Sequence, residues 1–336
     1  MRKISDETPA LSKRQFVRLM GGFGMGMALP VSTAVAQGEI YPSKLSTLVV
    51  GYTAGGAADT IARLLAQYFF PQYGAIVENR AGAGGMIGAR YVATAAADGY
   101  TLLQGNTGEI AINKYVNPDA GFDPDIGLVA AAMLYSTPTI ICVREDSPFK
   151  TLQDMIAAAK AKPGQVTFGS TGVGTQSHIA GEFLSREIGS KLNHVAYKGF
   201  PQGMADLMGG QIDSFWIAHP PAVPFLASKK IRYLALTTAR RSYFVPDVPT
   251  VSEVTGISSF DFPVWGGVFA PSKTPPKIIS ALNSEVKRVL MLPDMQEKVK
   301  QQNFEIMERT PEQAAEFVKG ESNKYRKIVA ELNIKV

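Results

Sequence analysis

Short apolar segments alternate with glycine-rich turns and amphipathic stretches along most of the chain. Residues 48–50 predict a buried strand, Gly55 and Gly56 the turn that follows, and Asp59 a helix cap ahead of apolar residues on one helical face. The same order recurs, so we expect further strands at residues 75–78, 101–104, 138–143, 165–169, 193–196, 214–217 and 233–237, and helices at 85–96, 152–160, 177–188 and 202–209. This alternation predicts an α/β fold with a largely parallel sheet.

Two extended apolar stretches are interrupted by proline and join different parts of this pattern, residues 136–148 and 260–271. We expect them to be the two crossings of a hinge. They predict a discontinuous first lobe, about residues 37–139 with 265–336, and a continuous second lobe, about residues 140–264. The tail from Pro275 has apolar residues at helical spacing, and we expect it to pack on the first lobe.

The first 36 residues have the pattern of an export signal. A basic region around Lys13 and Arg14 precedes an apolar, glycine-rich stretch at residues 19–35, and small residues ending at Ala36 predict the cleavage site. The segment at residues 12–18 is similar to a twin-arginine signal, with Lys13 in place of the first arginine. The sequence therefore leaves the export route open between the Sec and the twin-arginine pathways. The alternative, a membrane anchor, is disfavoured because five glycines or prolines interrupt the apolar run.

Composition and charge exclude several classes of protein. The chain has 336 residues, of which 46% are hydrophobic and 19% charged, enough for large cores in two domains. The formal net charge is +5, but the leader carries more than half of it, and no Lys/Arg cluster is longer than a pair. Nucleic-acid binding therefore has no electrostatic basis. The single cysteine, Cys142, excludes an intrachain disulfide and is expected to be a buried thiol.

Three glycine-rich turns, at residues 51–59, 82–88 and 169–178, follow predicted strands. Ligands of open α/β sheets bind at this carboxyl end of the strands, where free N–H groups at helix starts donate hydrogen bonds to anions without any basic side chain. The second turn has the spacing G-x-G-x-x-x-G, one residue too long for a dinucleotide fingerprint. The third turn carries hydroxyls, of Ser170 and Thr171 among others, that suit either an oxygen-bearing ligand or a helix cap.

Catalytic and metal-ligating patterns have little support in this sequence. His178, His194 and His219 are far apart, without H-x-x-x-H or C-x-x-C spacing, so we expect no metal site and no cofactor. A hydrolase using Ser170 and His178 is the enzymatic alternative, but the G-x-S-x-G elbow of such enzymes is not present. We therefore expect no catalytic residues and a protein that is not an enzyme.

Several motifs occur in a fixed order from about residue 41 to 320. They are Gly55-Gly56 with Asp59, Glu78-Asn79-Arg80 before residues 82–85, residues 98–102, Ala111-Ile112-Asn113, Gly169-Ser170 with Gly174 and His178, Tyr197-Lys198-Gly199, residues 209–213, residues 246–250, and Trp265 with residues 269–271. In this order they resemble the Bug family, the substrate-binding receptors of tripartite tricarboxylate transporters. The resemblance implies a type II periplasmic-binding-protein fold whose two lobes, joined by a two-strand hinge, close around a small carboxylate. It also implies a location in the periplasm and integral-membrane permease subunits as partners. We expect a monomer, although the sequence does not determine the oligomeric state.

The resemblance implies that the ligand carboxylate is held by the first glycine-rich turn and by the Ser/Thr turn of the other lobe. We therefore predict a ligand site made of Tyr52, Thr53, Gly55, Gly56, Asp59, Glu109, Ser170, Thr171, Thr175, His178 and Tyr197. The aromatic segment at residues 215–220, with Trp216 either in the core or in the pocket wall, suits a ring-bearing acid as well as an aliphatic one. A sensory module that docks on a histidine kinase is the alternative function.

Glu109 departs from the family pattern, because a small hydroxyl residue is usual at its position. A carboxylate that faces the cleft would repel an anionic ligand, unless it meets an amine, accepts from a ligand hydroxyl, or turns away to a Lys or Arg. Thr53 also departs from the pattern, standing where Pro or Ala is usual and adding a hydroxyl donor.

Overall fold

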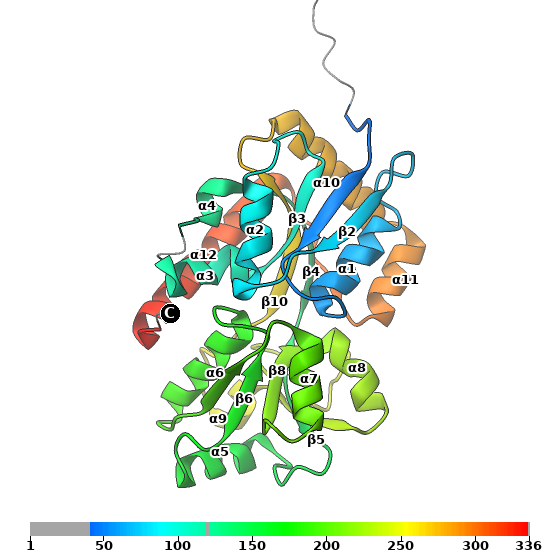
Figure 1. The fold of residues 1–336 in the computed structure, drawn as a ribbon. Helices are drawn as coiled ribbons and strands as arrows, with labels where there is room; N and C mark the ends of the chain where they lie inside the picture. Colours follow the sequence, from blue (N-terminus) through cyan, green and yellow to red (C-terminus); the bar gives the residue numbers. More distant parts are fainter. Residues whose placement is uncertain (1–40, 119–120, 335–336) are drawn as a thin grey trace, which may run out of the picture. The chain divides into compact units, whose positions relative to one another are not determined.

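The structure is a computed structural model that describes residues 41–118 and 121–334. Two mixed sheets form two lobes, which confirms the predicted two-lobed α/β fold. Figure 1 shows that the blue to cyan segments and the orange to red segments near the end of the chain build one lobe, while the green to yellow middle builds the other. The export leader predicted for residues 1–36 lies outside the described residues.

The first lobe is built on the six-stranded sheet, with strand order β11-β4-β10-β3-β1-β2. Its strands are β1 (Ser46–Val50), β2 (Ala75–Asn79), β3 (Thr101–Asn106), β4 (Leu128–Thr137), β10 (Val264–Pro271) and β11 (Glu305–Ile306). Its helices are α1 (Ala57–Ala66), α2 (Met86–Ala93), α3 (Asn113–Val116), α4 (Pro124–Gly127), α10 (Pro276–Leu290), α11 (Pro293–Gln301) and α12 (Pro311–Leu332), with short helical turns η1 (Ala83–Gly85) and η2 (Gly108–Ile112). The predicted tail helices thus pack where they were expected, α10 and α12 both against β4.

The second lobe is built on the five-stranded sheet, with strand order β7-β6-β8-β5-β9. Its strands are β5 (Thr139–Arg144), β6 (Thr167–Ser170), β7 (Asn193–Ala196), β8 (Ser214–Ala218) and β9 (Ile231–Leu236). Its helices are α5 (Leu152–Ala161), α6 (Gln176–Glu187), α7 (Phe200–Met208), α8 (His219–Ala227) and α9 (Val251–Thr255).

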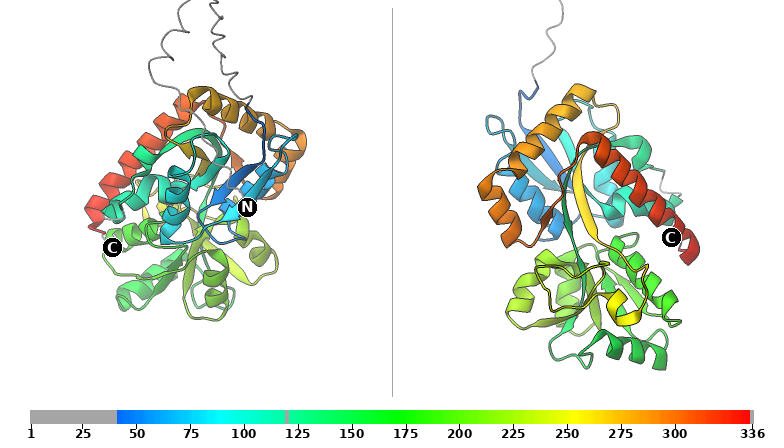
Figure 2. Two further views of the ribbon diagram at one scale, coloured as in Figure 1. Left: turned by 45° about the horizontal axis from the view of Figure 1, so that its top comes forward. Right: turned by 180° about the vertical axis from the view of Figure 1, so that it is seen from behind.

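The expectation of largely parallel sheets was wrong. Strand β1 pairs in parallel with β2 and β3, and β6 with β7 and β8, but β10 is antiparallel to both β3 and β4, and β5 is antiparallel to both β8 and β9. The physical reason is the passage between the lobes. The chain leaves the first sheet along β4, continues into β5 after Pro138, and returns as β10, so these strands run against their neighbours. Figure 2 (right) shows the two connections side by side.

The largest buried side chains anchor the two cores. Trp265 and Trp216 are both fully buried, so Trp216 belongs to the core of the second lobe and not to a pocket wall. Full burial of such a side chain contributes roughly 1.5–3 kcal/mol. Cys142 is also buried, and its thiol donates to the Phe215 carbonyl, while burial raises its pKa to about 12. Among the described residues, no helix combines the length and apolarity needed to cross a membrane.

Candidate functional site

A pocket with a volume of about 80 Å³ lies between the two sheets, at the carboxyl ends of β1, β3 and β6. A single water needs roughly 10–15 Å³ by this measure, so the space accommodates several waters or a small solute. All the side chains that line it are uncharged: Tyr52, Thr53, Gly56, Ala57, Ala58, Asn106, Thr107, Gly108, Tyr135, Thr139, Thr171, Thr175, Gln176, Ser177, Gly199, Phe200, Ile217, Ala218, Pro221 and Val264.

The amino ends of α1 and α6 reach this pocket from opposite lobes. Helix α1 follows the N-cap residue Gly56 and α6 follows Thr175, and neither N-cap side chain accepts from the helix. The Thr175 hydroxyl donates instead to the Gly172 carbonyl, at 2.6 Å. The first-turn N–H groups of both helices therefore lack intrahelical acceptors, and together with the helix dipoles they favour an anion.

Three helices whose amino ends lie away from the pocket do have a side-chain cap, although α2, α7, α8, α10 and α11 have none. The hydroxyls of Thr151, Thr250 and Thr310 cap α5, α9 and α12, each with a complete capping box. A threonine stands before α6 as well, so the difference lies in its conformation and not in the residue type. The uncapped ends of α1 and α6 are therefore available to a ligand in the pocket.

Asp59 supports the first glycine-rich turn from behind. It is not the helix cap that the sequence predicted, because α1 begins two residues earlier and Asp59 lies inside its first turn. Its carboxylate accepts from the Gly55 N–H at 3.0 Å, from Arg63 through two nitrogens and from the Asn79 amide at 2.9 Å. Burial alone would raise the pKa of Asp59, but these hydrogen bonds outweigh burial and hold the pKa below its usual range.

Glu109 is fully buried on η2, directly behind Tyr52. One carboxyl oxygen accepts from the Asn106 backbone N–H at 2.8 Å, and the other lies 2.7 Å from the Tyr52 hydroxyl. Its partners are thus a phenol and an amide, and not the amine, ligand hydroxyl, Lys or Arg considered from the sequence. Burial raises the pKa of Glu109 to about 7.

Three further polar side chains at the pocket have unused hydrogen-bonding atoms. The Asn106 side-chain oxygen accepts from Tyr135 at 2.7 Å, but its amide nitrogen has no partner among the described residues. The Thr53 hydroxyl is buried without a partner, and the Thr171 hydroxyl likewise has none within the described chain. A buried hydroxyl such as that of Thr53 is normally satisfied, and all three side chains are candidates for bonds to a ligand or to water.

Asn113 joins the second and third glycine-rich turns across the two lobes. Its amide nitrogen donates to the Ala83 carbonyl at 3.2 Å and to the Val173 carbonyl at 3.3 Å. A Cβ atom added at Gly84 or Gly174 would lie 2.6 or 2.5 Å from that nitrogen, and both glycines have positive φ. Glycine is therefore required at both positions for this contact to form.

His178 and His194 are far apart in the sequence but stack in the structure, with ring centroids 4.1 Å apart and an angle of 23° between the rings. The Ser170 hydroxyl lies 2.7 Å from His194 Nε2, so its partner is not the His178 of the hydrolase alternative. Burial lowers the pKa of His178 to about 3 and that of His194 to about 4. Both imidazoles are therefore neutral at physiological pH.

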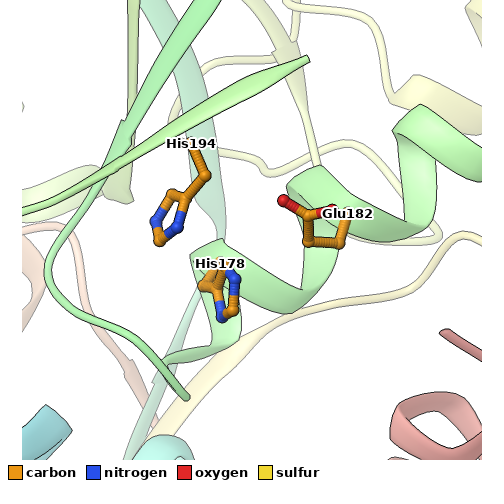
Figure 3. Close-up of side chains that lie close together, drawn as sticks. All are labelled: His178, Glu182 and His194. Atoms are coloured by element: carbon orange, nitrogen blue, oxygen red, sulfur yellow. The ribbon is translucent and has the colours of Figure 1, made fainter. Parts of the chain in front are cut away.

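Glu182 lies close to both imidazoles, as Figure 3 shows, with ligand atoms of the three side chains within 4.8 Å of one another. The geometry nevertheless opposes a metal ion. Nearly parallel stacked rings keep their nitrogen lone pairs in two separate, nearly parallel planes, which hinders convergence on one ion, and His178 Nδ1 already accepts from the Gly174 N–H. Metal binding would require the rings to turn and this bond to break.

The structure divides the eleven predicted site residues into three groups. Those that line the pocket are Tyr52, Thr53, Gly56, Thr171 and Thr175. Those that lie behind it and support its turns are Gly55, Asp59, Glu109, Ser170 and His178. Tyr197 borders a neighbouring pocket that Tyr52 also lines. Burial, and to a smaller extent the nearby Asp206 carboxylate, raise the pKa of Tyr197 to about 12.

Sequence reasoning missed other lining residues, above all Asn106, Tyr135, Gln176 and Phe200. The only signal in the sequence was the position of two of them in the predicted elements, because Asn106 ends β3 and Gln176 begins α6. Gln176 is held by Thr139, which donates to it at 2.7 Å, and it donates in turn to the Phe262 carbonyl. It thereby ties α6 to both connections between the lobes.

A family model described as the tripartite tricarboxylate transporter family receptor matches residues 55–334. Protein BugT from Bordetella pertussis (strain Tohama I) is 31% identical over 322 residues, which cover 95% of this chain and 98% of BugT.

Solved structures of similar proteins agree with this match. The periplasmic binding protein BugD superposes with a TM-score of 0.82 at 29% identity, covering 88% of this chain and all of BugD. An R. palustris protein solved with adipate superposes with a TM-score of 0.83 at 29% identity. The match covers 88% of this chain and 100% of that protein. MatC from Rhodopseudomonas palustris, solved with bound malate, superposes with a TM-score of 0.81 at 28% identity. The match covers 86% of this chain and 100% of MatC.

Proposed function

The chain belongs to the receptor family of the tripartite tricarboxylate transporters, and we propose that it captures a small carboxylate between its lobes and delivers it to the permease subunits of such a transporter. The family is one of periplasmic binding proteins, as the sequence resemblance indicated.

One observation carries the proposal: two uncapped helix ends from opposite lobes meet at a pocket whose lining has no charged side chain. Such a pocket holds a carboxylate through N–H and O–H donors. Each hydrogen bond to a charged group contributes roughly 1.5–3 kcal/mol, so four or five bonds outweigh the cost of immobilising the ligand and leave roughly micromolar affinity.

The remainder of the pocket suits an apolar body. Phe200, Ile217, Pro221 and Val264 line it together with the polar turns. Relatives were solved with adipate and malate, both aliphatic dicarboxylates. We therefore propose an acid with a short apolar body, aliphatic or aromatic, held by a carboxylate at α1 and α6. Calorimetry with adipate, malate, benzoate and glutamate tests this directly, and the absence of heat with every acid would refute carboxylate binding.

The contribution of α1 can be tested by replacing Ala57, its first residue, with proline. Proline is tolerated at this position and removes one N–H donor, while Gly56 before it is already extended. We expect adipate affinity to fall by about tenfold or more, because the ligand carboxylate loses one hydrogen bond and such a bond contributes about 1.5–3 kcal/mol. Ala57→Gly keeps the N–H and serves as the matched control. Equal affinities for the two variants, at unchanged thermal stability, would contradict a role for this helix end.

The proposed function also requires export of the chain and a division into two lobes. We propose that residues 1–36 are removed on passage to the periplasm, and that the lobes divide near residues 139 and 264, in keeping with strand membership of the two sheets. Protein recovered from a periplasmic fraction is expected to begin at Gln37. Intact mass spectrometry checks this, and a mass that includes the leader would contradict it.

A further inference from the structure

Glu109 places a carboxyl group behind a pocket that we propose to bind an anion. It contacts two lining residues, because Tyr52 and the Asn106 N–H both bond to its oxygens. It also lies against the second glycine-rich turn, since a Cβ added at Gly85 would be 2.8 Å from its Oε2. The side chain therefore holds the first turn, the second turn and the end of β3 in place.

The hydrogens around Tyr52 indicate the protonation state of Glu109. The Tyr52 hydroxyl oxygen lies 2.7 Å from Glu109 Oε2 and 3.0 Å from the Gly84 carbonyl oxygen. A phenol has one hydrogen, while a carbonyl and an ionised carboxylate only accept. With an ionised Glu109, the single hydrogen must serve both contacts. With a protonated Glu109, the carboxyl donates to Tyr52 and Tyr52 donates to Gly84, so both contacts are full hydrogen bonds.

No cation faces Glu109 from the elements packed against it in the described chain. The titratable groups nearest to it are the phenols of Tyr52 and Tyr135, whose pKa values burial raises. The charged residues of neighbouring helices have other partners or are exposed: Lys114 of α3 pairs with Asp125 of α4, Glu321 of α12 accepts from the Trp265 indole and pairs with Lys324, and Arg90 of α2 is exposed. An ionised Glu109 would thus be a buried charge without a counter-ion, which is costly.

We propose that the receptor binds its ligand while Glu109 is protonated, and that Glu109 acts as a neutral positioning residue, so that capture of a carboxylate is coupled to uptake of a proton. This inference rests on the proposed function. Burial raises the pKa of Glu109 to about 7, so near neutral pH the empty receptor holds both protonation states. An anion in the pocket favours the neutral state, because a second negative charge close by in a medium of low polarity is repelled.

The coupling predicts a direction for the pH dependence. Adipate affinity should be highest at pH 6 and fall by about thirtyfold as the pH rises to 8.5, since binding must then be preceded by protonation of Glu109, whose pKa is about 7. The stacked histidines do not change charge across this range, because the pKa values of His178 and His194 lie near 3 and 4. Calorimetry in two buffers of different ionisation enthalpy measures the proton uptake directly.

Glu109→Gln is the matched variant, because the amide is neutral at every pH and keeps the shape of the protonated carboxyl. We expect it to bind adipate at pH 6 about as tightly as the natural protein, with no proton uptake and no loss of affinity at pH 8.5. Affinity of the natural protein that does not change with pH would overturn the proposal. A folded Glu109→Gln variant that fails to bind adipate at pH 6 would also overturn it, since the negative charge would then be required.

Infrared spectroscopy of the ligand-free protein separates this proposal from the proposed function. A carbonyl band of a protonated carboxyl should be present at pH 6 in the natural protein and absent in Glu109→Gln. If no acid binds at any pH, the proposed function fails, while this band still decides the protonation of Glu109. A missing band in the natural protein would overturn the proposal independently of any ligand.

Discussion

Gly199→Ala should weaken ligand binding by about a hundredfold while leaving each lobe folded, because it prevents the lobes from closing. A Cβ atom at this position would lie 2.0 Å from the Thr53 hydroxyl oxygen, which belongs to the other lobe. The backbone itself tolerates alanine, since Gly199 has an extended φ of 166°. An open receptor keeps the bonds to only one lobe and loses two or three bonds to the carboxylate, which accounts for the size of the effect.

The clash can be relieved from the opposite side. Thr53→Ala removes the colliding oxygen, and the next atoms in reach are then Thr53 Cβ at 3.2 Å and its backbone nitrogen at 3.5 Å. The double variant Thr53→Ala, Gly199→Ala is therefore expected to recover most of the affinity lost in Gly199→Ala, as calorimetry would show. Small-angle scattering with saturating adipate should report an open form for the single variant only. A double variant that binds no better than Gly199→Ala would argue against the closure mechanism.

Asp59→Ala should lower the free energy of unfolding by about 2–3 kcal/mol, because it removes the acceptor of bonds from the Gly55 N–H, Arg63 and Asn79. The cost stays below the 3–5 kcal/mol typical of a broken buried pair, since the Arg63 side chain is 50% exposed and can be hydrated. Ligand affinity should fall as well, because the first glycine-rich turn loses its support. Urea denaturation and calorimetry measure the two effects.

Asp146→Ala provides the control for Asp59→Ala. Its pair with Arg144 is largely exposed, with side-chain exposures of 73% and 37%, and should contribute less than about 1 kcal/mol. The pH dependence has a definite sign: the pKa of Asp59 is lowered by folding, so its contribution is full at neutral pH and disappears as the pH falls through its folded pKa. The difference between the natural protein and Asp59→Ala should therefore shrink in acid. A constant difference would contradict the role of the ionised carboxylate.

The regular elements were predictable where the sequence pattern is local. Every expected strand occurs within a few residues of its predicted place, because short apolar runs bounded by glycine or polar residues identify buried strands. Helix α8 was missed, since three prolines and a uniformly apolar composition hide its start. Strand direction was misjudged, because pairing depends on where the chain crosses between lobes and not on the composition of each strand.

The pocket was only partly predictable for a related reason. The glycine-rich turns mark the ends of strands, and five of the predicted residues on them do line the pocket. Tyr135 and Thr139 come from the segment that crosses between lobes, and their orientation follows from a register that the sequence does not reveal. His178 and His194 stack because α6 leads into β7, which pairs in parallel with β6, a proximity set by topology.

Asn113 has a consequence for how the membrane partner distinguishes a loaded receptor from an empty one. Its bond to the Val173 carbonyl joins the lobes without any contribution from cargo. A neutral hydrogen bond contributes only about 0.5–1.5 kcal/mol, so it shifts the ratio of shut to open receptors by roughly tenfold at most. We therefore expect this bond to favour closure of the empty receptor by no more than that factor, so that a membrane partner would distinguish the loaded receptor by the larger stabilisation that the bound solute adds.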